Sequence, residues 1–465
     1  MRLRYAFSDP LECAQIHAYG IDTLQTMGVI VRDEKARKIF HDRGAKIDGM
    51  TVFLPETLVK EALATVPETF DFKTPGHRVS VGAGKLCTMP GYGATYVRRD
   101  GEVRLGTRAD FVNFTKFIQM SPDLSMSCPY VLVPYDLPFE YRNAYRMAMS
   151  LLYSDKPTFT VTEDYAATKE SIQIVKTYFG NGSDYLAVGN VNISAPLMMS
   201  EGTAGAILAH GEENQPLMIA CGSGLSGLTA PPLPAANLML SNAGVLAGIT
   251  LAQCVRPGLP VIYGFPLFGV DPYGAGAAVG NPTTALFTMA AAEMGKFYHL
   301  PVRAGGTFTD AVTLDYQSGF ESFMNLFSSL YAGVDCLMHT FGMEDSLNTL
   351  NYNKWILDEV LYHTVQDFLR GFEINDVTLM KDEVQKTGGD GNYIGMRNLR
   401  LIRKCYHPYA FKAKQDDPTA VLEATAAEIN DRLKHYRMPE TTPEQWAYIR
   451  KIIPGPLMGE GPKKP

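Results

Sequence analysis

The chain has no run of lysine and arginine residues of the kind that tracks the phosphates of a nucleic acid. Acidic side chains outnumber basic ones, 49 to 42, for a formal charge of -7. No segment contains 18 consecutive apolar residues, and Asp9, Pro10 and Glu12 stand where a signal peptide needs an apolar core. We therefore expect a cytoplasmic protein that neither binds nucleic acid nor spans a membrane.

Paired cysteines are also missing. The chain has 7 cysteines, and no two of them form a CxxC or CxC pair. Structural zinc sites and redox motifs need such close pairs, so the sequence predicts neither a zinc cluster nor a disulfide framework. The scattered positions are Cys13, Cys87, Cys128, Cys221, Cys254, Cys336 and Cys405.

Both ends of the chain show helical patterns. Within residues 1–85, IHAYGIDTLQTMGV and PETLVKEALATV have apolar residues at helical spacing, and GAKIDGMTVFLP between them predicts a tight hairpin. Within residues 371–465, TAVLEATAAEINDRLKHY and PEQWAYIRKII predict two more helices. We expect a helical N-terminal module and a C-terminal helical extension.

Residues 86–370 have a different pattern, in which short apolar runs alternate with segments of helix length. The runs are Ala94–Val97, Ser125–Val131, Thr158–Val161, Tyr185–Val191, Leu217–Ala220, Pro260–Tyr263, Pro301–Ala304 and Cys336–His339. Eight such runs predict an α/β fold of the (β/α)8 TIM barrel type. A doubly wound open sheet is the alternative, and the first run could instead belong to a hairpin at RRDGEVRLG.

The ends of these runs are where barrel chemistry takes place. They contain no pair of carboxylates for acid and base catalysis, no metal-binding cluster and no lysine for a Schiff base. They do contain aromatic residues, neutral amides, Arg303 and His339. Aromatic faces attract quaternary ammonium groups and an arginine fork binds a carboxylate, so the set suits a zwitterion such as a betaine.

Each of these residues also has a structural interpretation. Arg303 could form an internal ion pair with Asp310 or Asp315, and His339 could be an ordinary core histidine. Two glycine-rich stretches, GYGATY and CGSGLSG, resemble phosphate-binding loops. The second is followed by LTAPP, which cannot open the required helix, so both are interpreted as barrel loops.

Linked motifs along nearly the whole chain carry a resemblance to a known family. They are the N-terminal run from IHAYGIDTLQ to EALATVP, then RPGLPVIYG, PVRAGGT with Asp310, DYQSGFES and YNKWILDEVL. Together they resemble the trimethylamine methyltransferase family. The resemblance implies a (β/α)8 barrel that passes a methyl group from a methylated amine to the Co(I) of a separate corrinoid protein, and it implies a homo-oligomer.

The resemblance also implies a branch of the family. The trimethylamine branch carries pyrrolysine, whereas VDCLMHTFGMED at residues 334–345 contains only standard residues. The chain thus resembles the branch that lacks pyrrolysine, whose members use glycine betaine, proline betaine or carnitine. One departure is Arg397–Asn398, where the family pattern has a His-Thr pair.

The resemblance implies roles for particular residues. Arg303 and His339 would hold the substrate carboxylate. The residues expected around the ammonium are Tyr96, Phe265 and Phe341, with Tyr92 and Asn190 as further candidates. Gly305, Gly306 and Thr307 would line the mouth that the corrinoid approaches, and no residue acts as a covalent catalyst. The alternatives are a barrel lyase or aldolase, and a non-catalytic protein that binds a betaine or the corrinoid partner.

Overall fold

The body of the protein is built on a parallel β-sheet. The structure is a computed structural model, and it describes residues 9–180, 182–222, 224–271, 273, 276–405 and 420–453. The parallel strands follow one another in the order β9-β10-β12-β13-β16-β17-β6. Their bounds are β9 Thr158–Phe159, β10 Ala187–Ser194, β12 Leu217–Gly222, β13 Val261–Gly264, β16 Val302–Gly305, β17 Cys336–Met338 and β6 Cys87–Thr88.

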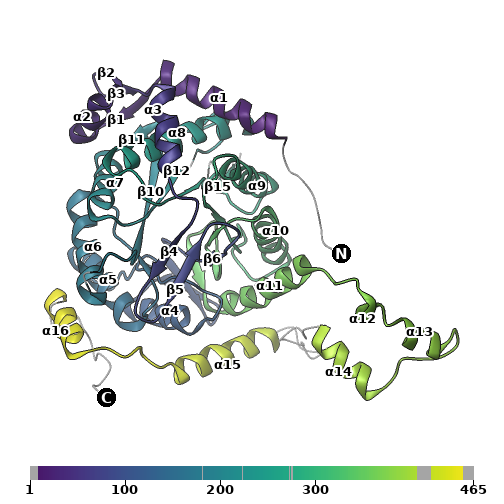
Figure 1. The fold of residues 1–465 in the computed structure, drawn as a ribbon. Helices are drawn as coiled ribbons and strands as arrows, with labels where there is room; N and C mark the ends of the chain where they lie inside the picture. The colour runs from purple at the N-terminus through teal and green to yellow at the C-terminus, as the bar shows by residue number, and fades with distance from the viewer. Residues whose placement is uncertain are drawn as a thin grey trace.

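Helices connect these strands and surround them (Figure 1). They are α4 Arg108–Met120, α5 Arg142–Tyr153, α6 Tyr165–Phe179, α7 Glu201–Glu213, α8 Pro234–Val255, α9 Pro282–Phe297, α10 Tyr316–Ala332 and α11 Tyr352–Arg370, with the short 3-10 helix η1 at Phe139–Tyr141 before α5. Most begin at a polar cap: Asp164, Ser200, Asn281 and Asp315 each accept a backbone N–H of the first turn. The fold is therefore of the α/β class.

The register of the strands separates an inner from a helix-facing side. Ile219 lies against Gly248 of α8 and Val302 against Gly295 of α9, so these two side chains face the helices. Neighbouring residues on a strand point to opposite sides. Arg303, which pairs in register with Gly264 and Cys336, therefore faces the inside of the sheet.

Six of the eight predicted runs are confirmed as parallel strands of this sheet, from β9 to β17. The prediction of Ala94–Val97 as a strand of this sheet was wrong. The alternative, a hairpin at RRDGEVRLG, is confirmed, because β7 Tyr96–Arg99 pairs with β8 Glu102–Leu105. This hairpin belongs to a separate four-stranded sheet with β18 Met343–Glu344 and β19 Thr349–Asn351. The strand that the sequence did not reveal is β6, which has only two residues.

The run Ser125–Val131 forms no assigned strand in the structure. Its backbone is nevertheless bonded to both ends of the parallel sheet. The N–H of Ser125 donates to Thr88 of β6, and the N–H of Ser127 donates to Pro157, which precedes β9.

The N-terminal segment combines helices with short strands. It contains α1 Pro10–Thr26, β1 Val29–Val31, α2 Glu34–Asp42, β2 Lys46–Asp48, β3 Thr51–Phe53, α3 Glu56–Thr65, β4 Phe70–Lys73 and β5 Arg78–Val81. The hairpin predicted at GAKIDGMTVFLP is confirmed as β2 and β3. β1 pairs in parallel with β11 Met198–Met199, so this segment extends the main sheet. A further short hairpin, β14 Gly269–Val270 with β15 Ala277–Ala278, follows β13.

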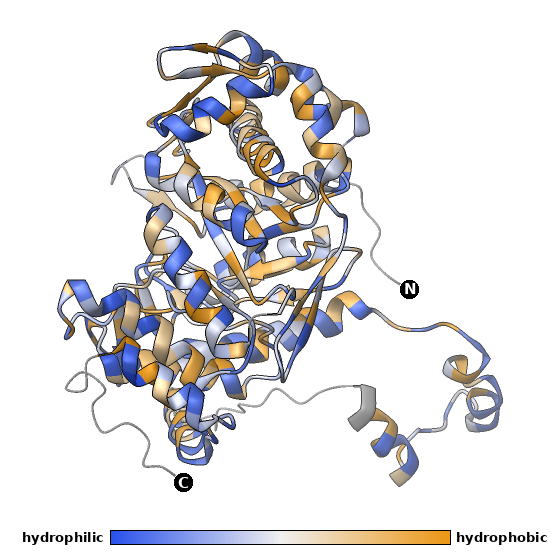
Figure 2. Ribbon diagram, turned by 60° about the vertical axis from the view of Figure 1, so that its left-hand side comes forward, coloured by the Kyte–Doolittle hydropathy of each residue, from blue (hydrophilic) through white to orange (hydrophobic). Residues whose placement is uncertain are grey.

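The C-terminal segment has two parts. The helices α15 Ala420–His435 and α16 Pro443–Ile452 return to the body, where α15 packs on α11 and α16 on α5. Before them, α12 Asp376–Leu379, α13 Lys381–Thr387 and α14 Met396–Cys405 stand away from the body in two views (Figures 1 and 2).

One helix among the described residues, α8, is long and apolar enough to cross a membrane. In its most apolar window, 83% of the residues are buried inside the protein. α8 packs against α1, α3 and β12, as the core helix of a globular protein does.

Candidate functional site

Arg303 is a buried cation without a counter-ion. Its side chain is on the inner side of β16 and only 5% of the residue is exposed. No carboxylate in the described part of the chain forms an ion pair with it, and its Nε has no hydrogen-bond partner. Burial lowers the pKa of Arg303 to about 10, so it remains charged at neutral pH.

The predicted alternative partners of Arg303 are occupied elsewhere. Asp310 accepts the N–H groups of Val279 and Gly280, and Asp315 caps α10 through the N–H of Ser318. The interpretation of Arg303 as half of a structural ion pair was therefore wrong. Gly264 on the neighbouring strand makes room for the arginine, because a Cβ there would lie 2.8 Å from Arg303 Cγ.

His339 follows β17 directly and lies next to Arg303. Burial, followed by the charge of Arg303, lowers the pKa of His339 to about 3, so the ring is neutral at physiological pH. Its Nδ1 lies 3.3 Å from the backbone N of Tyr92 and accepts that N–H. The ring proton is then on Nε2, where it can be donated to a ligand. The backbone of His339 has φ +53, an unusual conformation for a residue with a side chain.

Aromatic rings and an amide complete this cluster. Tyr92 stacks on Tyr130 with the ring centroids 5.0 Å apart and lies 5.8 Å from Phe159. Burial raises the pKa of Tyr92, while hydrogen bonds to Thr162 and Asn190 act in the opposite direction. Three buried polar atoms in the cluster lack a partner in the described chain: Tyr130 Oη, Asn190 Oδ1 and Arg303 Nε. Buried polar groups are normally bonded, so three in one place indicate a ligand site.

Arg146 of α5 is a second buried cation beside this cluster. Its guanidinium lies 4.3 Å from the centroid of the Tyr130 ring. It donates to Asn143 and reaches the carboxylate of Glu163 only at 4.0 Å. Arg146 thus holds Tyr130 in place through a cation–π contact.

Three predicted site residues lie outside the cluster. Phe341 is fully buried and packs against Trp355 and Tyr362 of α11. Phe265 packs edge-on against Tyr263, a residue of the helix-facing side. Tyr96 is 39% exposed in the separate four-stranded sheet.

The three residues predicted at the mouth, Gly305, Gly306 and Thr307, are closely packed by their neighbours. A Cβ on Gly305 would lie 1.8 Å from the ring of Phe308, and one on Gly306 would lie 2.5 Å from the carbonyl oxygen of His339. These glycines let the ring of Phe308 and the backbone of His339 pack closely against the end of β16 and the loop that follows it. Thr307 is buried, and its hydroxyl donates to Asp358.

Sequence reasoning missed Tyr130, Arg146, Phe159 and Phe308. Phe308 lies 6.1 Å from His339, ring to ring, and comes five residues after Arg303, in the loop that follows β16. Arg146 carried a usable signal, because an arginine stands among the apolar residues of RMAMSLLY.

The buried lysines are not available as nucleophiles. The Nζ of Lys156 donates to the carbonyls of Ile118, Ser121 and Leu124, each at 2.7 Å, and burial lowers its pKa to about 8. Lys156 precedes β9, so it lies at the opposite end of the strands from His339. Among the described residues no group of histidine, cysteine and carboxylate side chains could hold a metal ion.

Comparison with known proteins gives consistent results over most of the chain. The sequence profile of the family described as "Trimethylamine methyltransferase (MTTB)" matches residues 3–415. The chain is 31% identical to a glycine betaine methyltransferase of Desulfitobacterium hafniense, covering 84% of this chain and 83% of that one. It is 29% identical to a proline betaine:corrinoid methyltransferase of Eubacterium limosum, covering 94% and 95%.

The solved structures show a similar fold at low sequence identity. The monomethylamine methyltransferase of Methanosarcina barkeri superposes with a TM-score of 0.50 at 12% identity, covering 93% of both chains. Its hydroxylamine complex gives a TM-score of 0.51 with the same coverage.

Proposed function

This chain belongs to the trimethylamine methyltransferase family, and on that premise we propose that it transfers a methyl group from a betaine to the Co(I) of a separate corrinoid protein. Glycine betaine and proline betaine are the substrates named for its relatives. The relatives are named as methyltransferases, which argues against both alternative functions, a barrel lyase or aldolase and a non-catalytic binding protein.

The observation that carries the choice of a carboxylated substrate is the unpaired charge of Arg303. A buried ion without a counter-ion is destabilising by several kcal/mol, so the site favours a ligand that brings an anion. His339 is neutral and carries its proton on Nε2, which can donate a second hydrogen bond to the same carboxylate. An amine without a carboxylate would leave Arg303 unpaired.

The ammonium end of the substrate would face the aromatic side of the cluster. A quaternary nitrogen has no N–H to donate, so rings and a carbonyl oxygen suit it better than charged acceptors. Tyr92, Tyr130 and Phe159 supply the rings, and the free Oδ1 of Asn190 supplies the oxygen. Their roles, like those of Arg303 and His339, are part of the proposal.

The lack of a carboxylate pair at the predicted strand ends agrees with this reaction. A quaternary ammonium leaves as a neutral amine, so its departure needs no proton from the protein. The Co(I) of the corrinoid supplies the nucleophile. The chain has to hold the N-methyl bond in one direction, and such positioning can lower a barrier by about 7–11 kcal/mol.

We further propose that the sheet closes into a (β/α)8 barrel over residues 86–370, between an N-terminal module and a C-terminal extension. Support comes from the segment at Ser125–Ser127, whose backbone bonds to Thr88 on one side and Pro157 on the other. The ring of helices around the sheet would close at the same place, because Phe114 of α4 stacks on Tyr352 of α11 with the ring centroids 4.3 Å apart. The corrinoid protein would then approach over the C-terminal strand ends, and both proteins would work in the cytoplasm.

The test is a substrate panel. The protein is mixed without oxygen with Co(I) cobalamin, or with a reduced corrinoid protein, and methylcobalamin formation is followed by absorbance with glycine betaine, proline betaine, carnitine, choline or trimethylamine. We expect turnover with a carboxylated quaternary amine and none with choline, which has the ammonium without the carboxylate. Equal turnover with choline would contradict the role of Arg303, and no turnover with any compound would contradict the function.

A further inference from the structure

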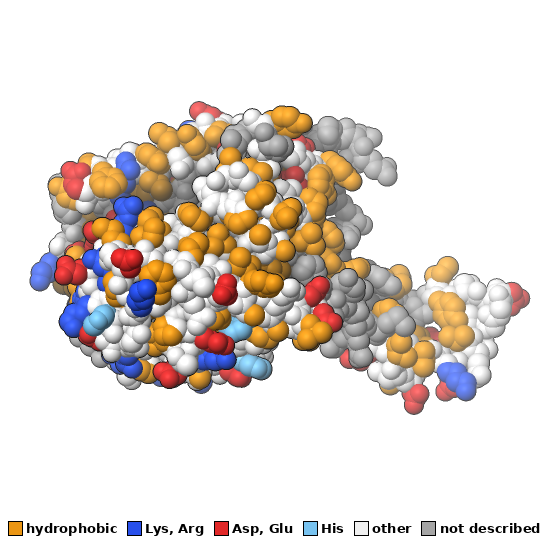
Figure 3. Space-filling model, turned by 90° about the horizontal axis from the view of Figure 1, so that it is seen from above, with side chains coloured by type: hydrophobic (Ala, Val, Ile, Leu, Met, Phe, Trp, Pro, Cys, Tyr) orange, Lys and Arg blue, Asp and Glu red, His pale blue; other side chains and the backbone are white. Residues whose placement is uncertain are grey.

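The segment of residues 371–405 forms an arm that leaves the body, and its apolar side chains are exposed. Figure 3 shows the arm at one side of the body with hydrophobic side chains on its surface. The exposed apolar residues, with their exposed fractions, are Ile374 57%, Val377 83%, Leu379 58%, Val384 51%, Tyr393 46%, Ile394 89%, Met396 68%, Leu399 45%, Leu401 39% and Ile402 51%. So large a set of exposed apolar groups indicates a surface that is covered by a partner.

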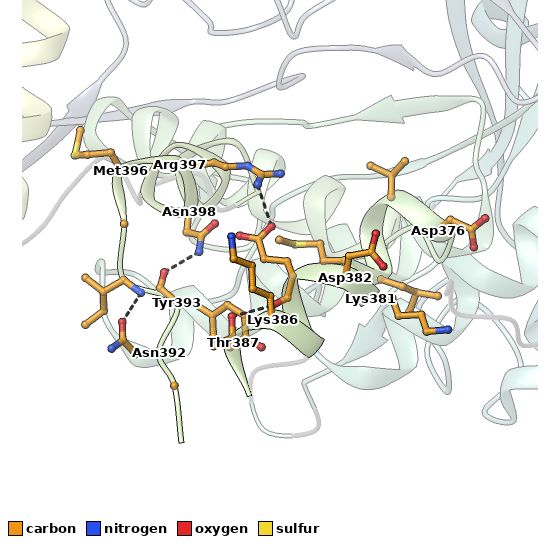
Figure 4. Close-up of a pocket in the computed structure, with 17 residues that line it drawn as sticks. Asp376, Lys381, Asp382, Lys386, Thr387, Asn392, Tyr393, Met396, Arg397 and Asn398 are labelled. Carbon is orange, nitrogen blue, oxygen red and sulfur yellow. Dashed lines mark hydrogen bonds and ion pairs between the residues drawn. The ribbon is translucent and has the colours of Figure 1, made fainter. Parts of the chain in front are cut away.

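The arm is also too small to be stable without cover. Its helices α12, α13 and α14 have 4, 7 and 10 residues, and isolated helices of this length are marginal in water. Few contacts hold them together: Arg397 pairs with Glu383 at 3.2 Å, and Asn398 donates to the carbonyl of Tyr393 at 2.8 Å (Figure 4). Arg397 and Asn398 are the two residues at which the sequence departs from the family pattern.

Between these segments the arm has a hollow of about 1060 Å³ that is open to the solvent on one side (Figure 4). Residues of α12 and α13 line one side, and residues 391–398 line the other. A hollow of this size, bordered by Val377, Leu379 and Ile394, can receive large side chains from another surface.

The body carries a matching surface, which we call the aromatic stripe. It consists of Tyr316, Phe320, Phe323, Phe327 and Tyr331, which lie along one face of α10. Phe327 stacks on both Phe323 and Tyr331 at 5.6 and 5.4 Å, and Tyr316 is 87% exposed. Phe327 also contacts Phe368 near the end of α11, so the stripe continues to the base of the arm.

The position of the arm excludes the corrinoid protein as the group that covers it. α11 begins near Phe341, which follows His339 by two residues, and at about 1.5 Å per residue its 19 residues span about 28 Å before the arm starts. The arm base is thus far from Arg303 and His339. In addition, the corrinoid protein has to leave after each methyl transfer, whereas the arm needs permanent cover.

We propose that the arm binds the aromatic stripe of a second copy of this chain, with the rings of the stripe inserted in the hollow of the arm. A two-fold axis near the arm base would let each copy cover the other, which is the self-complementary arrangement of most homodimers. The interface buries on each side a surface that the isolated chain exposes.

The test measures the mass of the full chain in solution by light scattering during size exclusion. We expect an assembly of at least two chains at micromolar concentration. An arm variant, Ile394→Asp with Met396→Asp, and a stripe variant, Phe320→Asp with Phe323→Asp, should each give the 51.2 kDa monomer. Val103→Asp, at a 44% exposed apolar position on β8, is the matched control and should stay assembled. Circular dichroism should show all three folded, because none of these residues belongs to the core.

A photo-crosslinking amino acid at position 394 identifies the surface that is covered. In a mixture of isotopically light and heavy chains, we expect mixed-mass links from position 394 to residues 316–331. A monomeric wild-type chain, variants that remain assembled, or links to any other segment would overturn the proposal.

Discussion

Lys354 and Arg303 are both buried cations, but they are surrounded by different groups. Lys354 of α11 lies 2.8 Å from Asp358 and also donates to Ser322 and to the carbonyl of Thr307. Arg303, inside the sheet, has no such partner among the residues that the structure describes. A buried charge that is fully paired supports the fold, whereas one left without a partner is prepared for a ligand. We call buried groups that are fully paired within the fold the frame of this protein, and buried groups left for a ligand its site.

We expect the largest loss of stability when a buried charge of the frame loses its partner. Asp358→Ala leaves Lys354 buried and without a counter-ion, and it removes one of the two acceptors near the Thr307 hydroxyl and the acceptor for the N–H of Gly342. We expect the free energy of unfolding, measured with urea, to fall by about 3–5 kcal/mol. The double variant Lys354→Met with Asp358→Leu should recover much of this loss, since it removes both charges. A double variant as unstable as the single one would show that packing, not charge, makes the pair important.

Two histidines allow the same comparison through pH. Burial lowers the pKa of His210, in the frame, to about 4, and that of His339, in the site, to about 3. Unfolded, both have a pKa near 6.5. Their contribution to stability is complete above pH 6.5 and falls as the pH drops from 6.5 toward these folded values, because only the unfolded chain takes up the protons.

Each histidine should lower the free energy of unfolding by about 1.4 kcal/mol per pH unit in this range. His210→Gln removes the contribution of the frame, and we expect the slope between pH 6.0 and 4.5 to decrease by about that amount. Urea titrations across this range measure the slope. An unchanged slope would mean that His210 is protonated in the folded protein.

Two tyrosines provide the smallest contrast. The hydroxyl of Tyr263 is buried and donates to Asn242 at 2.7 Å, whereas the buried hydroxyl of Tyr130 has no partner in the described part of the chain. Tyr263→Phe should reduce the free energy of unfolding by about 1–3 kcal/mol and leave the KM for the betaine unchanged. Tyr130→Phe should preserve stability and raise KM by about 3–10-fold. The opposite pattern would place Tyr263 in the site and Tyr130 in the frame.

The sequence was a good guide where strand and helix patterns were strong. Six apolar runs became parallel strands, and Arg303, His339, Tyr92 and Asn190 do meet on the inner side. The sequence was a poor guide where the location of a side chain depended on which side of a strand the residue faces. Phe265 and Phe341 are next to strand ends, yet they pack on Tyr263 and Trp355, and one residue of shift is enough to reverse the side.

Other features could not be predicted from local patterns at all. β6 has two residues and exists because β17 pairs with it. Thr307 stands in a polar run that looks exposed, but Asp358, 51 residues later, draws its hydroxyl into the core. Such contacts depend on residues far apart in the chain, and a single sequence does not show them.

The proposal that Arg303 binds the substrate carboxylate is tested with the variant Arg303→Met. Calorimetric titration measures its Kd for the betaine that the substrate panel selects, and urea unfolding measures its stability. An apolar side chain of similar length should remove the unpaired charge without leaving a cavity. The account predicts that Kd rises at least about 100-fold, a loss of about 2.7 kcal/mol, while the free energy of unfolding is unchanged or increases. A variant that binds the betaine with unchanged Kd but unfolds more easily would contradict it, because Arg303 would then belong to the frame.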